Sequence, residues 1–333
     1  MSIKRVAESI HSDLWIKGDV SSVFNLCDCI LEVFRDEGER KDRQKARLMW
    51  LVEDYGVEGF TDKIKAMLKE RDIETSAWQP HPTDAFERRE LLGVHKQKQE
   101  GLNRVGILVP VGRMSRHEAR ELADVADRYS GGEVRLTVEQ NAILPNVRDE
   151  DIAALIKEPM FGPDKRLKIE AGNIEGGVVS CTGSQFCGFA MIETKQTAER
   201  YAKLLEEVVE TDRPLRIHWT GCPNSCGQVQ AADIGLMGCP ARKVDPETGK
   251  KMAVPGVNIF IGGTIGEHGS LQLEPEKKAV LVEEETLIPE LVDIIVNRFG
   301  GRRIQQKDYE GNSKRAEDLA LLELVGEPEL DTV

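Results

Sequence analysis

The sequence predicts an α+β protein, and three patterns along its 333 residues support this class. Residues 1–92 carry mainly helical patterns, whereas residues 93–160 alternate strand, helix, strand, strand and helix patterns. Residues 161–310 combine short strands and two helices with loops that contain four cysteines. Residues 311–333 form an acidic tail. A chain of this length forms one large domain or two ordinary ones, and we expect these four segments to be its divisions.

The composition is typical of a soluble globular protein, with 40% apolar and 31% charged residues. A formal net charge of −13 argues against nucleic acid or an anionic membrane surface as the partner. No segment approaches the ~18 consecutive apolar residues that a membrane span requires. Seven cysteines are an odd number in a chain too large to depend on disulfides, which indicates a reducing compartment. The first residues show no targeting peptide.

An amphipathic helix is predicted from Val20 to Phe34, where apolar residues follow helical spacing and Gly38 provides the end. Cys27 and Cys29 fall on this helix. Positions i and i+2 of a helix point about 200° apart, so these two thiols cannot hold one metal together. We therefore expect them to be core or half-buried thiols.

A basic run over residues 40–47 follows this helix and precedes the apolar residues 48–51. Such a run is typical of a solvated helix face. In a redox protein that receives electrons from an acidic carrier, it would instead serve as a docking patch. The sequence leaves both interpretations open, and the stretch 74–81, which contains two prolines, then predicts a linker.

A new unit begins near Gly93. We expect a buried strand over 104–111, then a helix, two more strands over 133–138 and 141–147, and a short helix from 149. The first helix should begin at a capping box made by Ser115 and Glu118 and stop at the glycines 131 and 132. This pattern supplies most of an α+β sandwich but too few strands, so we expect an open sheet edge.

Two cysteine pairs lie between residues 181 and 226. Cys181 and Cys187 are six positions apart, and Cys222 and Cys226 are four positions apart. Two loop-borne pairs of thiolates are what a tetrahedral metal ion or an iron–sulfur cube requires. The wide first pair favours a cube, because structural zinc uses tighter spacing. Zinc and unrelated buried thiols stay open as alternatives.

Each pair follows a strand pattern, 176–180 before the first and 215–219 before the second. We therefore expect each pair in a turn at the end of a strand, where backbone N–H groups can point at sulfur. Glycines at positions 183, 188 and 221 fit such turns.

Two residues near the pairs have less specific roles. His218, on the second strand pattern, is expected in the core or behind the ligands and not as a ligand. Cys239 has no partner cysteine close in sequence, and we expect it to be inert. A helix should follow the first pair, with the residues 198, 201, 202, 205 and 209 on its buried face.

The residues around the cysteines resemble a known family. Cys181-Thr-Gly-Ser-Gln-Phe-Cys187, followed by His218-Trp-Thr-Gly-Cys-Pro-Asn-Ser-Cys226, is similar to the siroheme- and [4Fe–4S]-containing nitrite and sulfite reductases. Within that family, both motifs and the segment 228–230 look like the ferredoxin–nitrite reductase branch. The resemblance covers nearly the whole chain, including the segments 43–45, 93–101 and 135–140.

This resemblance implies a fold, an activity and partners. The fold would be the C-terminal part of the nitrite/sulfite reductase fold, with a helical segment, a ferredoxin-like half-domain and an α/β domain for cluster and siroheme. The activity would be the assimilatory six-electron reduction of nitrite to ammonia, with reduced ferredoxin as the electron donor. The resemblance further implies the chloroplast stroma in a plant or alga and the cytoplasm in a cyanobacterium.

The resemblance also assigns site residues. Cys181, Cys187 and Cys222 would hold the [4Fe–4S] cluster, and Cys226 would bind both the cluster and the siroheme iron. Gln185 and Asn224, which lie inside the pairs, are candidate cofactor-binding donors, with ordinary turn chemistry as the alternative.

The resemblance implies a site that continues upstream of this chain. Nitrite is an anion and siroheme carries carboxylates, so the site needs fixed Arg and Lys side chains. In the family these distal residues belong to an N-terminal half, so the catalytic residues stay unassigned here and a missing N-terminal half is an expected partner. The alternatives are part of a ferredoxin-dependent sulfite reductase and a non-catalytic, truncated metal-binding product.

Overall fold

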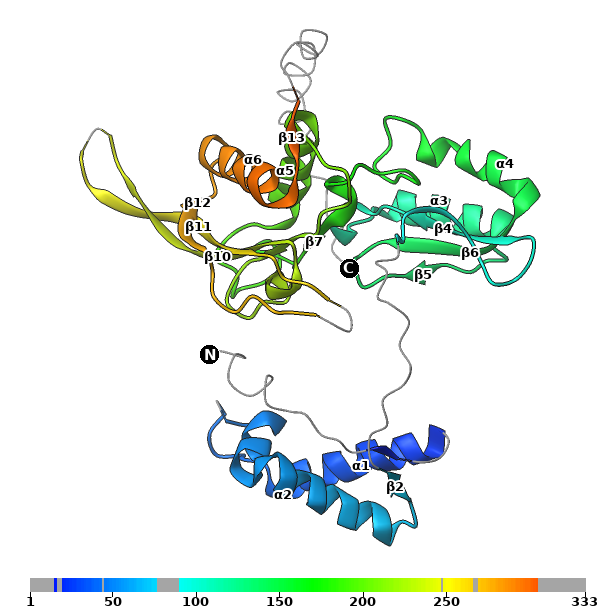
Figure 1. Ribbon diagram of the computed structural model, residues 1–333, viewed down its shortest axis with the longest axis vertical. Coiled ribbons are helices and arrows are strands. Elements are labelled where there is room, and N and C mark those ends of the chain that lie inside the picture. The colour runs from blue at the N-terminus through cyan, green and yellow to red at the C-terminus, as the bar shows by residue number, and fades with distance from the viewer. Residues whose placement is uncertain are drawn as a thin grey trace. The chain divides into compact units, whose positions relative to one another are not determined.

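The computed structural model describes the residue ranges 15–16, 20–43, 45–76, 90–246, 248–265 and 269–304 (Figure 1). Contacts between residues divide the chain into two compact units, 1–87 and 88–333. Each unit is described by itself. The expected tail 311–333 and residues 77–81 of the expected linker lie outside the described residues.

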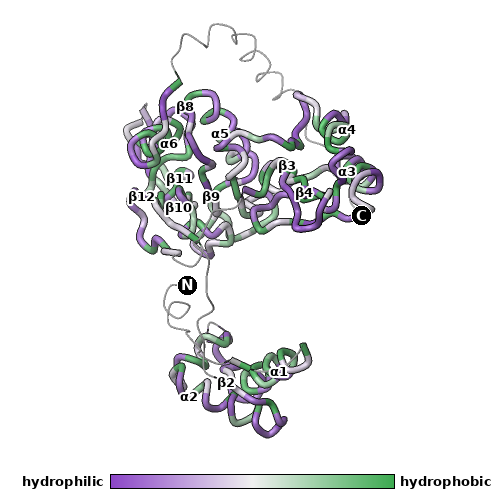
Figure 2. Tube along the Cα trace, turned by 45° about the vertical axis from the view of Figure 1, so that its right-hand side comes forward, coloured by the Kyte–Doolittle hydropathy of each residue, from purple (hydrophilic) through white to green (hydrophobic). Residues whose placement is uncertain are grey.

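The first unit is a pair of helices accompanied by a two-residue ribbon. Helix α1 spans Val20–Glu37 and helix α2 spans Leu48–Glu70, while strand β1 (Trp15–Ile16) pairs antiparallel with strand β2 (Thr75–Ser76). Along α1 the tube changes between green and purple, as expected for an amphipathic helix (Figure 2). The core residues include Cys29, Val33, Leu51, Ile64 and Leu68. The helix predicted from Val20 is confirmed.

The two cysteines of α1 lie in different environments, so the expectation of core or half-buried thiols is confirmed for Cys29 and wrong for Cys27. Cys29 is fully buried, whereas Cys27 is exposed. Burial raises the pKa of the Cys29 thiol above its ordinary value, and the nearby Arg71 charge opposes that shift. Cys29 is therefore a core residue and not half of a metal-binding pair.

The interpretation of the basic run 40–47 as a helix face is wrong. Its described residues form the loop between α1 and α2. The Nη2 of Arg40 donates to the carbonyl oxygen of Phe34 at 2.7 Å, and its guanidinium lies 4.6 Å from the centroid of the Phe34 ring. Because a cation at the last carbonyls stabilises the end of a helix, the run caps α1 instead of continuing it.

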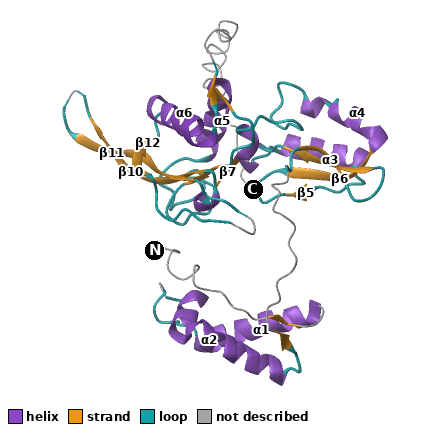
Figure 3. Cartoon of the chain, in the orientation of Figure 1, coloured by secondary structure: helices purple, strands orange, loops and turns teal. Residues whose placement is uncertain are grey.

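The second unit contains two larger sheets, drawn in orange in Figure 3. The first has four antiparallel strands in the order β3–β4–β6–β5. Its strands and accompanying helices are β3 (Gly93–Lys96), β4 (Leu102–Ile107), α3 (Arg116–Tyr129), β5 (Arg135–Leu136), β6 (Ala142–Arg148) and α4 (Ile152–Ile156). The predicted order of elements is confirmed, with one additional strand, β3, that the sequence did not predict.

The start of α3 confirms the predicted capping box. The Oγ of Ser115 accepts the N–H of Glu118 at 3.2 Å, and the Glu118 carboxylate accepts the N–H of Ser115 at 2.7 Å. After the helix, Gly131 and Gly132 have φ angles of 62° and 79°, in the left-handed region that favours glycine. Both ends of the helix are therefore determined locally.

The second sheet has five strands in the order β12–β11–β10–β9–β7. They span Val178–Ser180 (β7), Ile217–Thr220 (β9), Ile234–Val244 (β10), Lys251–Ile261 (β11) and Lys277–Leu281 (β12). Strands β7, β9 and β10 are parallel, and β11 and β12 continue antiparallel. Helices α5 (Lys195–Val208) and α6 (Glu284–Phe299) lie beside each other next to this sheet (Figure 1), and a ribbon joins β8 (Val209–Glu210) to β13 (Arg302–Arg303).

The core of the second sheet confirms the predicted buried face of α5. All five predicted residues are buried, and the Tyr201 ring meets the Trp219 ring of β9 edge to face with centroids 5.8 Å apart. No helix in the described ranges is both long and apolar enough to cross a membrane.

Two strands differ from their sequence patterns. The strand expected over 104–111 ends at Ile107, because Pro110–Gly112 forms a 3-10 turn in which Val111 has a φ of 50°. The alternation of the segment 215–219 does not appear as one buried and one exposed face. All of β9 is buried, because the strand lies between β7 and β10.

Candidate functional site

Both cysteine loops begin at the same edge of the second sheet. Strands β7 and β9 run parallel with Ser180 opposite Trp219, and Cys181 follows Ser180 directly. The N–H of Cys181 donates to the carbonyl oxygen of Trp219 at 3.0 Å, and Cys222 comes just after the end of β9. Since the carboxyl ends of parallel strands meet at one edge, the fold brings the two predicted loops together.

A backbone N–H points at a cysteine sulfur, as predicted. Gly221 donates to the Sγ of Cys181 at 3.2 Å. The Oγ1 of Thr194 lies 3.7 Å from the same sulfur and donates to the carbonyl oxygen of Cys181 at 2.9 Å. The Gly221 N–H is thus a hydrogen-bond donor that would tune a cluster bound to this sulfur.

The two loops also brace each other through their backbones. The N–H of Met191 donates to the carbonyl oxygen of Gly221 at 2.7 Å, which ties the end of the first loop to the start of the second. A Cβ added to Gly221 would lie 2.6 Å from the Cβ of Ala190. Glycine at position 221 therefore allows the loops to approach closely.

The first loop turns at Gly183. This residue has a φ of 76°, and an added Cβ would lie 2.5 Å from the Oγ1 of Thr194. Its carbonyl oxygen accepts the N–H of Cys187 at 3.0 Å, which closes the turn between the two cysteines. The turns predicted at Gly183 and Gly221 are confirmed by these contacts.

The four thiols differ in exposure. Cys222 is buried, Cys181 and Cys187 are half-buried, and Cys226 is exposed. Across the described part of the chain, no three Cys, His, Asp or Glu side chains form a group that could hold a single metal ion. The donor set fits an iron–sulfur cube, which is larger than one ion and prefers soft thiolates delivered by loops.

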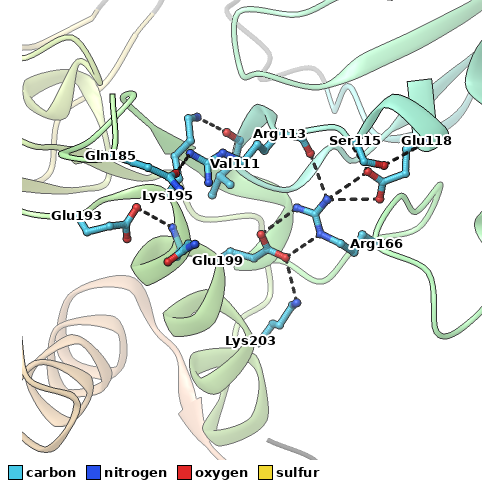
Figure 4. A network of polar contacts seen from close by, with 11 residues as sticks. Val111, Arg113, Ser115, Glu118, Arg166, Gln185, Glu193, Lys195, Glu199 and Lys203 are labelled. Carbon is cyan, nitrogen blue, oxygen red and sulfur yellow. Dashed lines mark hydrogen bonds and ion pairs between the residues drawn. The ribbon is translucent and has the colours of Figure 1, made fainter. Parts of the chain in front are cut away.

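Gln185 and Asn224 lie inside the two cysteine loops, and their surroundings do not show whether they bind a cofactor. The Oε1 of Gln185 accepts a hydrogen bond from Arg113, and the Arg113 guanidinium lies 5.7 Å from the centroid of the Phe186 ring (Figure 4). Asn224 is exposed. Their roles as cofactor-binding donors stay predictions. Cys239 lies on β10, and its Sγ contacts the Oδ1 of Asn258 at 3.4 Å.

Lys195, the first residue of α5, holds the backbone at the end of β7. Its Nζ donates to the carbonyl oxygen of Val111, as Figure 4 shows. It also donates to the carbonyl oxygen of Ser180 at 3.1 Å. Burial and the nearby Arg113 charge lower the pKa of Lys195, whereas the thiol of Cys181 acts in the opposite direction. Lys195 therefore fixes the carbonyl oxygen of the residue that precedes Cys181.

Arg166 connects the helices of the two sheets. It contacts Glu199 of α5 at 2.9 Å and Glu118 of α3 at 3.3 Å, and it donates to the carbonyl oxygen of Arg113 at 3.3 Å (Figure 4). Sequence reasoning missed this network because Arg166 and its two carboxylates are 33 and 48 positions apart. No local pattern in the sequence brings them together.

Gln140 connects the four-stranded sheet to the first cysteine loop. Its side-chain amide donates to the carbonyl oxygen of Ser180 at 2.8 Å and accepts the Ser180 N–H at 3.0 Å. Ser180 is thus held by strand β9 on one side and by a glutamine amide on the other. The residue that precedes Cys181 therefore has little freedom.

Comparison with protein families gives two matches. The model of the nitrite/sulfite reductase ferredoxin-like half domain matches residues 95–161. The model of the nitrite and sulphite reductase 4Fe-4S domain matches residues 1–72 and 172–319, which include all four loop cysteines.

Comparison with individual proteins gives relatives that are named for the same activity. The chain is 44% identical to the chloroplastic ferredoxin–nitrite reductase of Spinacia oleracea over 93% of this chain and 50% of that one. It is 46% identical to the ferredoxin–nitrite reductase of Synechococcus elongatus over 90% and 56% of the two chains. The solved NirA protein of Mycobacterium tuberculosis is 25% identical, with a TM-score of 0.71 over 85% of this chain and 50% of that one. The chain thus spans about half the length of the curated relatives it matches.

Proposed function

This chain belongs to the nitrite and sulphite reductase family, and from that premise we propose that it carries the cofactor-binding part of a ferredoxin-dependent nitrite reductase. The observation that carries the proposal is the meeting of two cysteine loops at one sheet edge, with the N–H of Gly221 directed at the Sγ of Cys181. Four thiols in this setting suit a [4Fe–4S] cluster.

The proposed cluster ligands are Cys181, Cys187, Cys222 and Cys226. Cys226 would also bind the iron of siroheme, and its exposure supports this double role because a buried thiol would leave no room for a second group. Bound there, the cofactors would supply electron storage and an iron site for the substrate. Gln185 and Asn224 are proposed as donors beside them.

The protein contributes hydrogen bonds and charge to the proposed site. The Gly221 N–H and the Thr194 hydroxyl lie beside the Cys181 sulfur, and the Lys195 ammonium lies behind it. The Gly221 N–H would continue to donate to this sulfur in a cluster-bound state, and such hydrogen bonds tune the potential of a cluster.

Nitrite is the proposed substrate and ferredoxin the proposed electron donor. The reaction consumes one nitrite, six electrons and eight protons and yields one ammonium ion and two waters. The Spinacia and Synechococcus relatives are ferredoxin–nitrite reductases, which supports nitrite over sulfite. We further propose the stroma as its compartment in a plant or alga, and the cytoplasm in a cyanobacterium.

Visible absorption and metal analysis of anaerobically purified protein test the proposal. We expect about five iron atoms for every four acid-labile sulfides, with the Soret and red bands of siroheme. A broad brown shoulder without those bands would show a cluster without siroheme. Colourless protein that contains zinc or no metal would contradict the proposal.

A further inference from the structure

Strand β9 holds the residue that follows Cys226 through two polar contacts and a close approach of the backbones. The Nδ1 of His218 lies 2.8 Å from the carbonyl oxygen of Gly227, and the N–H of Gly227 donates to the Oγ1 of Thr220 at 3.5 Å. A Cβ added to Gly227 would lie 2.2 Å from the carbonyl oxygen of Trp219. Three consecutive strand residues thus determine where the backbone after Cys226 can lie.

His218 is the donor in its contact with Gly227. A carbonyl oxygen only accepts, so Nδ1 carries the proton and Nε2 of the neutral ring keeps a lone pair. Burial lowers the pKa of His218, which favours that neutral ring. Nε2 is buried and pairs with no group in the described part of the chain, so the imidazole contacts Gly227 through Nδ1.

Cys226 depends on its neighbours for its position. It is exposed, and within the described ranges neither its backbone nor its thiol makes a hydrogen bond. Cys181, by contrast, is held at its N–H, its carbonyl oxygen and its sulfur. Its two neighbours are held instead: the N–H of Ser225 donates to the carbonyl oxygen of Cys222 at 3.2 Å, and strand β9 holds Gly227.

We infer that His218 is the positioning residue of Cys226, and that it acts through the carbonyl oxygen of Gly227. The imidazole holds the second loop so that the thiol of Cys226 keeps the direction that a ligand shared by two cofactors requires. This role rests on the proposed function, in which Cys226 is that shared ligand.

Asparagine and glutamine separate the two nitrogens of His218. The amide nitrogen of asparagine reaches the place of Nδ1, whereas that of glutamine reaches the place of Nε2. His218→Asn therefore keeps the donor to Gly227, and His218→Gln loses it. Loss of one neutral hydrogen bond should raise about fivefold the ratio of molecules in which the second loop has moved to those in which it keeps this position.

The first measurement is the alkylation rate of Cys226 by iodoacetamide in the full chain after removal of iron, which leaves the thiol free; mass spectrometry follows it, normalised to the exposed Cys27. We expect about a fivefold faster rate in His218→Gln and the original rate in His218→Asn. The ratio of siroheme absorbance to iron should fall in the first variant and hold in the second. Equal behaviour of the two variants, whether changed or unchanged, would overturn the inference.

Two further variants keep the test decisive. Thr220→Val removes the other polar contact to Gly227 and should raise the Cys226 rate even if His218→Gln does not fold. His95→Asn breaks a comparable contact, from Nε2 to the carbonyl oxygen of Leu92 at 2.6 Å, in the other sheet and should leave the rate unchanged. If the original protein lacks siroheme, the proposed function fails, while the alkylation rates still decide the role of His218.

Discussion

Gly221 donates its backbone N–H to the Sγ of Cys181 at 3.2 Å, so the loop of the second cysteine pair holds the sulfur of the first. The two pairs are separated by 34 residues of chain between Cys187 and Cys222, yet this bond makes them one structure. A substitution at Gly221 should therefore displace the cysteines of both pairs.

Replacing Gly221 by alanine should separate the loops. The new Cβ would meet the Cβ of Ala190 at 2.6 Å, and overpacking of this kind costs about 1–3 kcal/mol. We expect a lower urea midpoint and less iron per chain. Gly188→Ala is the matched control, because it lies in the same region with no atom within 4 Å of an added Cβ. Equal losses in both variants would show that the close approach does not matter.

Serine substitutions should distinguish the ligands from the other thiols. Cys181→Ser, Cys187→Ser and Cys222→Ser should each lose iron and sulfide, because a hydroxyl is a poor ligand for an iron–sulfur cluster. Cys239→Ser should retain both, since its sulfur contacts Asn258 away from the loops. Iron and acid-labile sulfide are the measurements. Loss of iron in Cys239→Ser equal to that in Cys181→Ser would contradict the ligand assignment.

Glu199 should contribute to stability in a way that depends on pH. Burial favours the neutral acid, but the hydrogen bond from Arg166 and the charges of Lys203 and Arg166 outweigh it and lower the pKa of Glu199. A lowered folded-state pKa gives stability that is present above the ordinary pKa of about 4.3 and is lost as the pH falls through the folded value. Urea midpoints of the wild type should therefore fall more steeply below that pH than those of Glu199→Gln. Parallel pH profiles would contradict this role.

Ser115 should stabilise the start of α3. Its Oγ accepts the Glu118 N–H, and removal of such a cap costs about 1 kcal/mol. We expect Ser115→Ala to lower the melting temperature and Ser115→Asp, which retains a capping oxygen, to lower it less. Equal melting temperatures for the wild type and Ser115→Ala would show that the neighbouring Arg166–Glu118 contact is sufficient.

Local signals explain which elements the sequence could predict. Helix α5 and the cap at Ser115 depend on residues within a few positions of one another, and both were predicted correctly. The cysteine loops were predicted because glycine and strand patterns flank them. Strand β3 was missed because its alternating exposure comes from only four residues, Gly93–Lys96, two of them polar.

Contacts between distant segments explain what the sequence could not show. Arg40 ends α1 by reaching back to Phe34, and a run of charges contains no sign of that geometry. Lys195 reaches Val111 across 84 positions, and Gln140 reaches Ser180 across 40. Such partners become evident only when the two sheets are placed together, so the surroundings of Cys181 were the least predictable part of the site.

The double contact between Gln140 and Ser180 has a consequence for assembly. Strand β7 lies at the end of its sheet, where a free N–H and carbonyl would invite a strand from another molecule. The Gln140 amide occupies both groups of Ser180, as a neighbouring strand would. A side chain from the turn between β5 and β6 thus occupies the place of a neighbouring strand at Ser180, which should oppose strand addition beside the first cysteine loop.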